Sequence, residues 1–397
     1  MKDGEVPMRR GSFQLMKSVN KSIILNKIRI SEPISRAQIA KETKLTPPTV
    51  SSIVKELLEQ GIVRESKLGE SMGGRKPTML HINSSAFYVI GVDAGPQTVE
   101  CILTNLSGEI FERTSTKLMQ PITNDQFISI LKENIRKILQ SSITEKDKII
   151  GIGVAMHGVV DVESGTSLVA PNLGLRDMPI KTELEEEFNT VVHVENDARA
   201  MALGESWFGG HGDVDSMVAV NIGQGIGSGV VINGKLYHGE QDIAGELGHM
   251  TIDIHGKVCD CGNRGCLQTF ASGEAIAERA RIQIKETIPS VKITGKQVYE
   301  MAQNGEADYI KILEETGEII GIGLTNLIHM INPGRIVLGG GVMRSEKFMM
   351  PVIQKTIAER ALIPRAKETE VTVTKLGDDA TLLGAVSLLL VELFDPV

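Results

Sequence analysis

Four side chains that bind metals well lie close together in the second half of the chain. Cys259 and Cys261 form a Cys-x-Cys pair, Cys266 follows, and His249 stands ten residues before the first cysteine. Thiolates and an imidazole at this density are typical zinc ligands, and four protein ligands make a closed, structural site. Three cysteines within eight residues also suit a metal better than a disulfide framework. Unpaired buried thiols are the alternative.

A second group of polar residues has the sequence Val-Glu-Asn-Asp-Ala over residues 194–198. It follows an expected strand and opens an expected helix. From this place the Asp197 carboxylate can accept the proton of a substrate hydroxyl or hold that hydroxyl by a hydrogen bond. Capping of the helix by Asn196 or Asp197 explains the same residues equally well, and both interpretations stay open.

Two glycine-rich turns have the composition of phosphate-binding loops. Residues 221–229 contain glycine at four alternate positions, whose backbone N–H groups could surround a phosphate. Tight β-turns also need glycine, so this pattern alone is weak. The other turn, residues 93–98, contains Pro96, which has no N–H and would remove one donor from such a loop.

The first eighty residues predict a DNA-binding head. Apolar residues at helical spacing predict a helix over residues 14–30, and Ser35 can cap a short helix over residues 36–42. Thr46 and Pro47 then signal the start of a third helix, which Gly61 ends. This helix carries one apolar stripe. The stripe consists of Val50, Ile53, Val54, Leu57 and Leu58.

The opposite face of the third helix has the properties of a DNA-recognition surface. Small, hydroxyl-bearing and basic side chains suit entry into the major groove. We expect DNA contacts from Pro48, Thr49, Ser51, Ser52 and Lys55. Residues 62–82 predict a β-hairpin wing, whose Arg75 and Lys76 supply phosphate or minor-groove contacts. A protein-docking module of two short helices and a hairpin is the alternative.

The charge distribution agrees with such a head. Residues 1–81 hold 15 Lys and Arg against 8 Asp and Glu, a net charge of +7 on a chain whose total is −8. A basic head on an acidic body favours DNA binding, although an ordinary basic surface would give the same count. We find no secretory leader, and the longest apolar run, residues 381–391, is too short to span a bilayer. We therefore expect a cytoplasmic protein without membrane contact.

From residue 87 onwards, strands alternate with helices, which predicts α/β layers. A strand–turn–strand pattern appears at residues 88–114 and starts again near residue 217. The repetition predicts two similar lobes, and ligands of such folds bind between lobes.

Several of these motifs together resemble the ROK family of sugar kinases and repressors. The family signature and its metal-binding motif are fitted by Gly225–Val230, Gly239, Gly245–His249 and Cys259–Cys266. In the head, similarity to the xylose repressors of this family lies in Ile34–Ala40, Thr49–Ser52 and Gly73–Pro77. The resemblance covers almost the whole chain.

The resemblance implies an actin-like, two-lobed kinase fold that binds a sugar between its lobes. It implies that Asn196 and Asp197 bind the sugar, with Asp197 at the position of the catalytic base. It also implies sugar contacts from Asn172, Glu246 and His249, of which His249 is a zinc ligand as well. One structural zinc ion per chain would then fix the sugar-binding loop.

Two departures from the family pattern affect the expected activity. The kinase branch has Asp-x-Gly-Gly-Thr where this chain has Asp-Ala-Gly-Pro-Gln at residues 93–97. Phosphoryl transfer depends on positioning and backbone donors, so Pro96 and Gln97 disrupt the first phosphate loop. We predict a vestigial kinase in which Asp197 no longer catalyses. Gln268, also an expected sugar contact, stands where the family usually has glutamate, and an amide donates as well as accepts.

We therefore predict an α/β protein with a winged helix-turn-helix in residues 1–82 and a two-lobed, ribonuclease H-like ROK fold behind it. The first lobe covers residues 86–205, the second covers residues 206–377 with the zinc loop, and the helix 378–397 packs back on the first lobe. The expected function is repression of carbohydrate-utilisation genes, with xylose among the candidate effectors. A homodimer or dimer of dimers would bind a double-stranded operator until a small sugar releases it.

Two alternatives compete with this prediction. One is an active, ATP-dependent ROK sugar kinase, similar to glucokinases, that carries a regulatory DNA-binding head. The other is a DNA-binding protein that responds to no ligand because its sugar site is vestigial.

Overall fold

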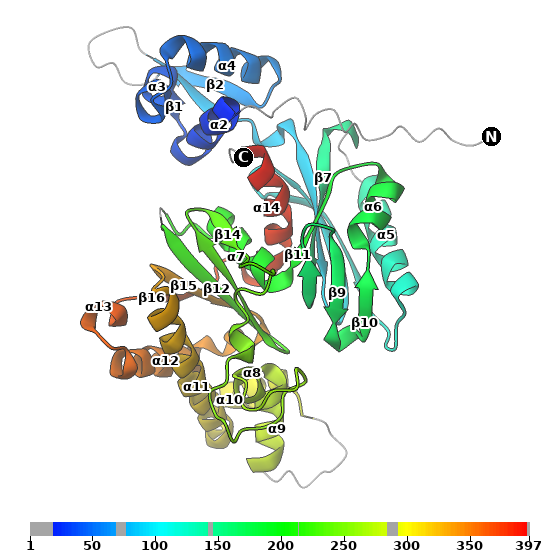
Figure 1. The fold of residues 1–397 in the computed structure, drawn as a ribbon, viewed down its shortest axis with the longest axis vertical. Coiled ribbons are helices and arrows are strands. Elements are labelled where there is room, and N and C mark those ends of the chain that lie inside the picture. Colours follow the sequence, from blue (N-terminus) through cyan, green and yellow to red (C-terminus); the bar gives the residue numbers. More distant parts are fainter. Residues whose placement is uncertain (1–18, 69–76, 142–145, 213, 284–292, 395–397) are drawn as a thin grey trace, which may run out of the picture. The chain divides into compact units, whose positions relative to one another are not determined.

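Two compact units make up the chain. The computed structural model describes residues 19–68, 77–141, 146–212, 214–283 and 293–394. The first unit contains residues 1–197 and 385–397, and the second contains residues 198–384 (Figure 1). The boundaries thus lie at Asp197 and Gly384, whereas the sequence suggested residues 205 and 377.

The N-terminal head of the first unit is a winged helix-turn-helix. Its elements are α2 (Val19–Ser31), β1 (Ile34–Ser35), α3 (Arg36–Thr43), α4 (Pro47–Glu59), β2 (Val63–Leu68) and β3 (Thr78–Ile82). The expected starts of α3 and α4 are confirmed. The Ser35 hydroxyl accepts a hydrogen bond from Gln38 N at 3.2 Å, and the Thr46 hydroxyl accepts one from Thr49 N at 3.4 Å.

The wing follows α4 after a turn at Gly61, whose φ of 72° favours glycine. Strands β2 and β3 pair antiparallel, and β1 completes a sheet of order β1-β3-β2. Val63 and Ile82 face each other in this register and are both buried. Arg75 and Lys76, the expected wing contacts, lie outside the described residues.

The rest of the first unit is built on a five-stranded sheet of order β11-β7-β4-β5-β6. Its strands are β4 (Tyr88–Ala94), β5 (Thr98–Asn105), β6 (Ile110–Lys117), β7 (Ile149–Met156) and β11 (Val192–Asn196). Strands β4, β5 and β6 form an antiparallel meander, whereas β7 runs parallel to both β4 and β11. The carboxyl ends of β4, β7 and β11 therefore lie next to one another at one edge of the sheet.

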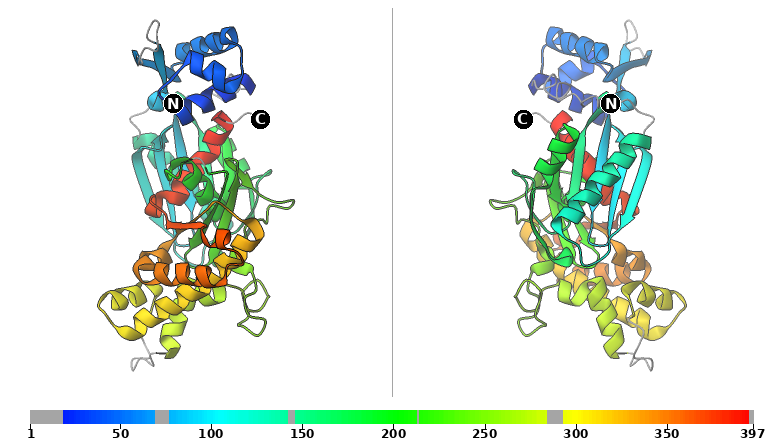
Figure 2. Two further views of the ribbon diagram at one scale, coloured as in Figure 1. Left: turned by 90° about the vertical axis from the view of Figure 1, so that its left-hand side faces the viewer. Right: turned by 90° about the vertical axis from the view of Figure 1, so that its right-hand side faces the viewer.

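Helices cover both faces of this sheet. All eight residues of β7 are buried, as expected for a central strand with helices on both sides. Helix α5 (Asn124–Ser141) buries its apolar stripe on one face, through residues such as Phe127 and Leu131. The last part of α14 (Ala380–Phe394) lies on the other face, as the two views of Figure 2 show.

A small sheet of order β10-β9-β8 was not predicted from the sequence. Its strands are β8 (Val159–Asp161), β9 (Thr166–Ala170) and β10 (Leu175–Met178), and α6 (Ile180–Phe188) follows. These strands are short and only partly buried, so they lack the continuous apolar runs that mark β4 and β7. Gly158, before β8, has a φ of 99°, and a side chain there would lie 2.1 Å from Val169 O.

The second unit repeats the sheet topology of the first. Its sheet has the order β14-β13-β12-β15-β16, again with an antiparallel meander followed by parallel strands. The strands are β12 (Ser216–Ile222), β13 (Ile226–Ile232), β14 (Lys235–Tyr237), β15 (Arg335–Gly339) and β16 (Glu370–Val373). The expected restart near residue 217 is therefore confirmed.

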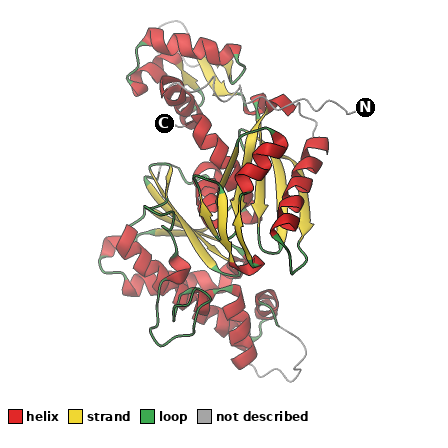
Figure 3. Cartoon of the chain, turned by 45° about the vertical axis from the view of Figure 1, so that its right-hand side comes forward, coloured by secondary structure: helices red, strands yellow, loops and turns green. Residues whose placement is uncertain are grey.

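Alternating residues of β12 face two different helical layers. Val218 and Val220 pack with residues of α11 and α12, whereas Met217 and Ala219 pack with residues of α7. Figure 3 shows the helical layer of this unit in red beside the yellow sheet. The helices are α7 (Asp197–Phe208), α8 (Gln268–Ala271), α9 (Gly273–Gln283), α10 (Gly295–Gln303), α11 (Ala307–Ile331), α12 (Glu346–Arg360) and α13 (Pro364–Lys367).

The glycine-rich segment 221–229 is mostly strand rather than a loop. Only Gly223–Gly225 form the turn, and β13 already begins at Ile226. A Cβ atom on Gly227 would lie 2.8 Å from Ala198 Cβ, and one on Gly229 would lie 2.6 Å from Ala202 Cβ. Close packing of α7 on β13 therefore accounts for two of these glycines, which weakens the comparison with a phosphate loop.

Helix α14 belongs to both units and packs on glycines in each. In the second unit, a Cβ on Gly384 would lie 2.0 Å from Ala200 O in α7. In the first unit, a Cβ on Gly153 of β7 would lie 1.8 Å from Ala385 O. None of the described helices has the length and apolarity needed to cross a membrane.

Candidate functional site

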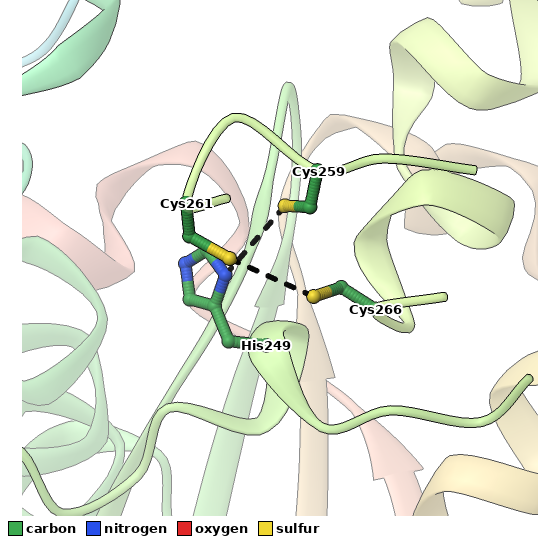
Figure 4. A group of neighbouring side chains, drawn as sticks. All are labelled: His249, Cys259, Cys261 and Cys266. Carbon is green, nitrogen blue, oxygen red and sulfur yellow. Dashed lines mark hydrogen bonds between the residues drawn. The ribbon is translucent and has the colours of Figure 1, made fainter. Parts of the chain in front are cut away.

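The second unit brings the four expected metal ligands together. The ligand atoms of His249, Cys259, Cys261 and Cys266 all lie within 4.8 Å of one another (Figure 4). Cys259 Sγ is 3.8 Å from His249 Nδ1, and Cys261 Sγ is 3.7 Å from Cys266 Sγ. Ligands of a tetrahedral ion with bonds of about 2.3 Å are separated by about 3.7 Å. The donor set and its spacing therefore fit a metal ion.

Tight turns hold the cysteines in place. Cys259 N donates to Asn263 O at 2.7 Å, and isolated β-bridges join Thr251 to Cys266 and Val258 to Arg264. Gly265 has a φ of 68°, and a Cβ there would lie 1.6 Å from Asp253 O. The loop therefore closes through backbone contacts that leave no room for a side chain at this position.

The fourth cysteine of the chain takes no part in this cluster. Cys101 lies on β5 and is fully buried in the core of the first unit. Burial raises the pKa of the Cys101 thiol well above its ordinary value. A neutral buried thiol is inert, so Cys101 is a packing residue.

Gln268, at the start of α8, joins the metal cluster to the glycine-rich turn. Its Nε2 donates to Cys259 Sγ at 3.2 Å, and its Oε1 accepts from Ile226 N at 3.5 Å. Only an amide can make both contacts, since a carboxylate has no proton to donate. Gln268 thus has two protein partners in addition to its expected role in sugar binding.

Glu246 and His249 lie on a segment held closely against β13. A Cβ on Gly245 would lie 2.3 Å from Ser228 O, and one on Gly248 would lie 2.0 Å from Ile226 O. His249 turns Nδ1 towards Cys259, and its Nε2 is 4.0 Å from Glu246 Oε2. Glu246 is exposed. A metal ion on Nδ1 would therefore fix the imidazole ring beside the Glu246 carboxylate.

The other expected sugar-binding residues belong to the first unit. Asn196 ends β11 and Asp197 begins α7, as the sequence predicted. Asn196 Nδ2 donates to Gly158 O at 2.9 Å and to Asp197 Oδ1 at 3.0 Å. These bonds orient the Asp197 carboxylate. Asn172 is exposed in a short 3₁₀ helix between β9 and β10.

Sequence reasoning missed His157, which follows β7 at the same edge of the sheet. His157 Nδ1 is 3.4 Å from Asp197 Oδ2, and its backbone N–H donates to Ala94 O at 3.2 Å. Asp93 lies near the end of β4, the strand to which the His157 backbone bonds. Burial, followed by the charges of Asp197 and Glu100, raises the pKa of Asp93 to about 7. A titratable residue directly after a fully apolar strand was the feature that could have pointed to His157.

The head presents most of the expected DNA-contacting residues to solvent. Pro48, Ser51, Ser52 and Lys55 are exposed on α4, and the Lys55 side chain is 77% exposed although it lies 3.8 Å from Glu59. Thr49 is only half-exposed, and its hydroxyl shares a hydrogen bond of 2.8 Å with the Thr46 hydroxyl. Thr49 therefore contributes to the start of the helix as well as to its surface.

Comparisons with known proteins also separate the N-terminal head from the rest of the chain. Residues 18–69 match the MarR family, and residues 89–392 match the ROK family. The xylose repressor of Bacillus subtilis (strain 168) is 34% identical over 385 residues, which cover 96% of this chain and 97% of that protein.

Two solved structures extend the comparison. One is a ROK family transcriptional regulator, a homologue of the E. coli MLC protein, with a TM-score of 0.84 and 28% identity over 95% of this chain and 96% of that one. The other is a ROK family glucokinase from Streptomyces griseus in complex with glucose and AMPPNP, with a TM-score of 0.68 and 27% identity over 76% of this chain and 98% of that one. The chain belongs to the ROK family and joins an actin-like ROK fold to a MarR-like winged helix-turn-helix.

Proposed function

We propose that the protein is a sugar-responsive repressor of carbohydrate-utilisation genes. The observation that carries this proposal is the presence of a winged helix-turn-helix and a ROK fold in one chain, an arrangement shared over nearly full length with a xylose repressor and a ROK transcriptional regulator. A pentose such as xylose is the first effector to test, and hexoses and amino sugars follow. Since an operator lies on the chromosome, the repressor acts in the cytoplasm.

The proposed operator contacts come from α4 and from the wing. Pro48, Ser51, Ser52 and Lys55 form the exposed surface of α4, with Thr49 at its edge. Hydroxyl groups can bond to base edges or phosphates, and the Lys55 ammonium can neutralise a phosphate. Arg75 and Lys76 are proposed wing contacts. Two such heads in a homodimer, or in a dimer of dimers, would fit a palindromic operator.

The proposed sugar contacts are made by amides, carboxylates and a ring nitrogen, which are groups that bind sugar hydroxyls. The residues are Asn172, Asn196, Asp197, Glu246, His249 and Gln268. Support comes from the match of five of these residues to family sugar-binding positions; Gln268 stands where the family usually has glutamate. Binding of a sugar that favours one conformation by about 1–3 kcal/mol would shift the repressor away from its operator.

We also propose that the metal is zinc, bound by His249, Cys259, Cys261 and Cys266. Three thiolates and one imidazole are a common structural zinc set, and four protein ligands leave no open position. The ion would hold the loop and the His249 ring in place, and it would take no part in chemistry.

Exchange of Gln268 for glutamate tests the link to this metal. In Gln268→Glu the donor to Cys259 Sγ is lost and a negative charge faces the thiolates, so we expect the metal to be released to a chelator about tenfold faster. The release can be followed with a colorimetric zinc indicator. Gln303→Glu makes the same chemical change at the end of α10 and serves as the control. Equal release rates in all three proteins would show that the hydrogen bond does not stabilise the metal.

We propose that the chain is not a kinase. Its similarity to a glucokinase structure is the observation that favours the kinase alternative. The turn between β4 and β5 contains Pro96, which offers no N–H to a phosphate, and Gln97. No ADP release is therefore expected when the protein is given ATP and a panel of pentoses, hexoses and amino sugars. Sustained turnover with any of these sugars would establish the kinase instead.

The proposed function is tested by titrating the protein into a fluorescent duplex of its own promoter region at fixed salt. We expect sequence-specific binding that a sugar reverses, and about tenfold weaker binding for Lys55→Ala. Lys137→Ala is the matched control, because Lys137 forms a similar exposed i,i+4 pair with Glu133 on α5. Binding that is indifferent to sequence and unaffected by every sugar would overturn the proposal.

A further inference from the structure

His157 occupies the meeting point of three neighbouring strand ends in the first unit. It directly follows β7, its backbone N–H bonds to Ala94 at the end of β4, and its ring contacts Asp197 directly after β11. Ligands of open α/β sheets bind at the carboxyl ends of such strands. The ring is therefore placed where a small ligand of this sheet would lie.

The two ring nitrogens of His157 have different surroundings. Nδ1 lies 3.4 Å from Asp197 Oδ2. Nε2 is buried and has no hydrogen-bond partner among the described residues. Buried polar atoms almost always have a partner, so an unsatisfied ring nitrogen calls for one that the protein chain does not provide.

Acidic groups surround the ring and favour its charged form. Burial alone would lower the pKa of His157, but the hydrogen bond to Asp197 and the charges of Asp197 and Asp93 outweigh it and raise this pKa. Glu100 on β5 adds a further negative charge near Asp93. With Nδ1–H directed at Asp197, the charged ring also carries a proton on Nε2, which makes Nε2 a donor.

We propose that His157 is a further effector-binding residue, which donates a hydrogen bond from Nε2 to a hydroxyl oxygen of the sugar while Asp197 holds Nδ1. The inference rests on the proposed sugar-responsive function and adds a residue to its effector site. His157 would also influence which sugars bind, because a sugar satisfies Nε2 only if it has a hydroxyl oxygen at that place.

Proton linkage follows from this arrangement. Because the donor is the charged ring, sugar binding stabilises the proton on His157, and affinity falls as pH rises through the pKa of that residue. A sugar that binds above this pKa takes up a proton from the buffer. Asp93, whose pKa is raised to about 7, also titrates, so the contribution of His157 has to be isolated by substitution.

Two substitutions separate the roles of the two nitrogens. Asparagine at position 157 can replace the Nδ1 donor but does not reach the place of Nε2, whereas glutamine places an uncharged donor near Nε2. We expect His157→Asn to bind the sugar about tenfold more weakly than the wild type, with the pH dependence reduced. His157→Gln should recover part of the affinity, and its pH dependence should be reduced as well.

Calorimetric titration of the full-length protein with D-xylose, D-glucose and N-acetylglucosamine, each from pH 6 to pH 9, provides the measurement. Thermal unfolding and operator affinity without sugar check that each variant is folded. His193→Gln is the control, because His193 also pairs with a carboxylate, Glu392 at 2.7 Å, but is the second of five residues of β11 rather than lying after its end.

The outcomes distinguish the inference from the proposed function. If the wild type binds a sugar and His157→Asn binds it equally well with the same pH profile, the inference is wrong and the sugar-responsive function stands. If His193→Gln loses as much sugar affinity as His157→Asn, the inference is also wrong. If the wild type binds none of the three sugars at any pH, both ideas fail together.

Discussion

Replacement of Cys266 by alanine is expected to yield protein without metal and with a strongly destabilised second unit. Cys266 is fully buried, and its sulfur is 3.7 Å from that of Cys261. Structural zinc contributes about 10–16 kcal/mol of apparent binding free energy in zinc-finger peptides. Loss of even a fraction of this binding free energy would lower the melting temperature of the second unit markedly. Elemental analysis and thermal unfolding measure the two effects.

The same variant should lose its sugar response and keep its operator affinity. The proposed metal would fix His249 beside Glu246, whereas α4 and the wing belong to the first unit. Cys101→Ala is the control, because it removes a buried thiol that lies outside the cluster and should leave the metal content unchanged. A Cys266→Ala protein that still holds one metal ion and melts like the wild type would refute the structural role of the cluster.

Replacement of Gly153 by alanine is expected to destabilise the first unit by about 3 kcal/mol or more. The added Cβ atom would lie 1.8 Å from Ala385 O and 2.6 Å from its carbonyl carbon. Both are backbone atoms of α14, which cannot rotate away as a side chain could. The helix must therefore move off the sheet, and Leu389, 3.2 Å from the same Cβ position, moves with it. Chemical denaturation followed by circular dichroism measures the loss.

Gly341 provides the matched control for this experiment. A Cβ atom there would meet nothing within 4 Å, and its backbone does not have a positive φ. Gly341→Ala should therefore leave the free energy of unfolding almost unchanged or raise it slightly, because alanine reduces the freedom of the unfolded chain. Similar losses in the two variants would show that α14 does not pack closely on β7 in solution.

Features encoded by short stretches of sequence could be predicted well. Ser35, Thr46 and Pro47 act on helix ends within a few residues, so both helix starts in the head were predicted at the correct residues. The four residues of the His–Cys cluster were predicted as a set for the same reason, since three of the four lie within one loop. The two similar lobes were predicted from the strand–turn–strand pattern that starts again near residue 217.

Features that depend on distant contacts could not be predicted in this way. Gly227 and Gly229 suggested a phosphate loop, but packing against α7 explains them, and that contact joins segments about 30 residues apart. The importance of His157 depends on Asp93 and Asp197, which approach it only through the parallel pairing of three strands. Short, half-exposed strands such as β8 carry too little apolar pattern to be recognised.

The division of the first unit into two separate stretches of chain has a consequence for biosynthesis. Residues 385–394, which cover one face of β7, leave the ribosome only after the whole of the second unit has been made. The central strand of the first unit, which ends at Met156, therefore keeps an uncovered apolar face while about 230 further residues are translated, roughly 10–50 s at bacterial elongation rates. The nascent repressor is thus most exposed to aggregation and to chaperone binding during this interval, after its winged head has already emerged.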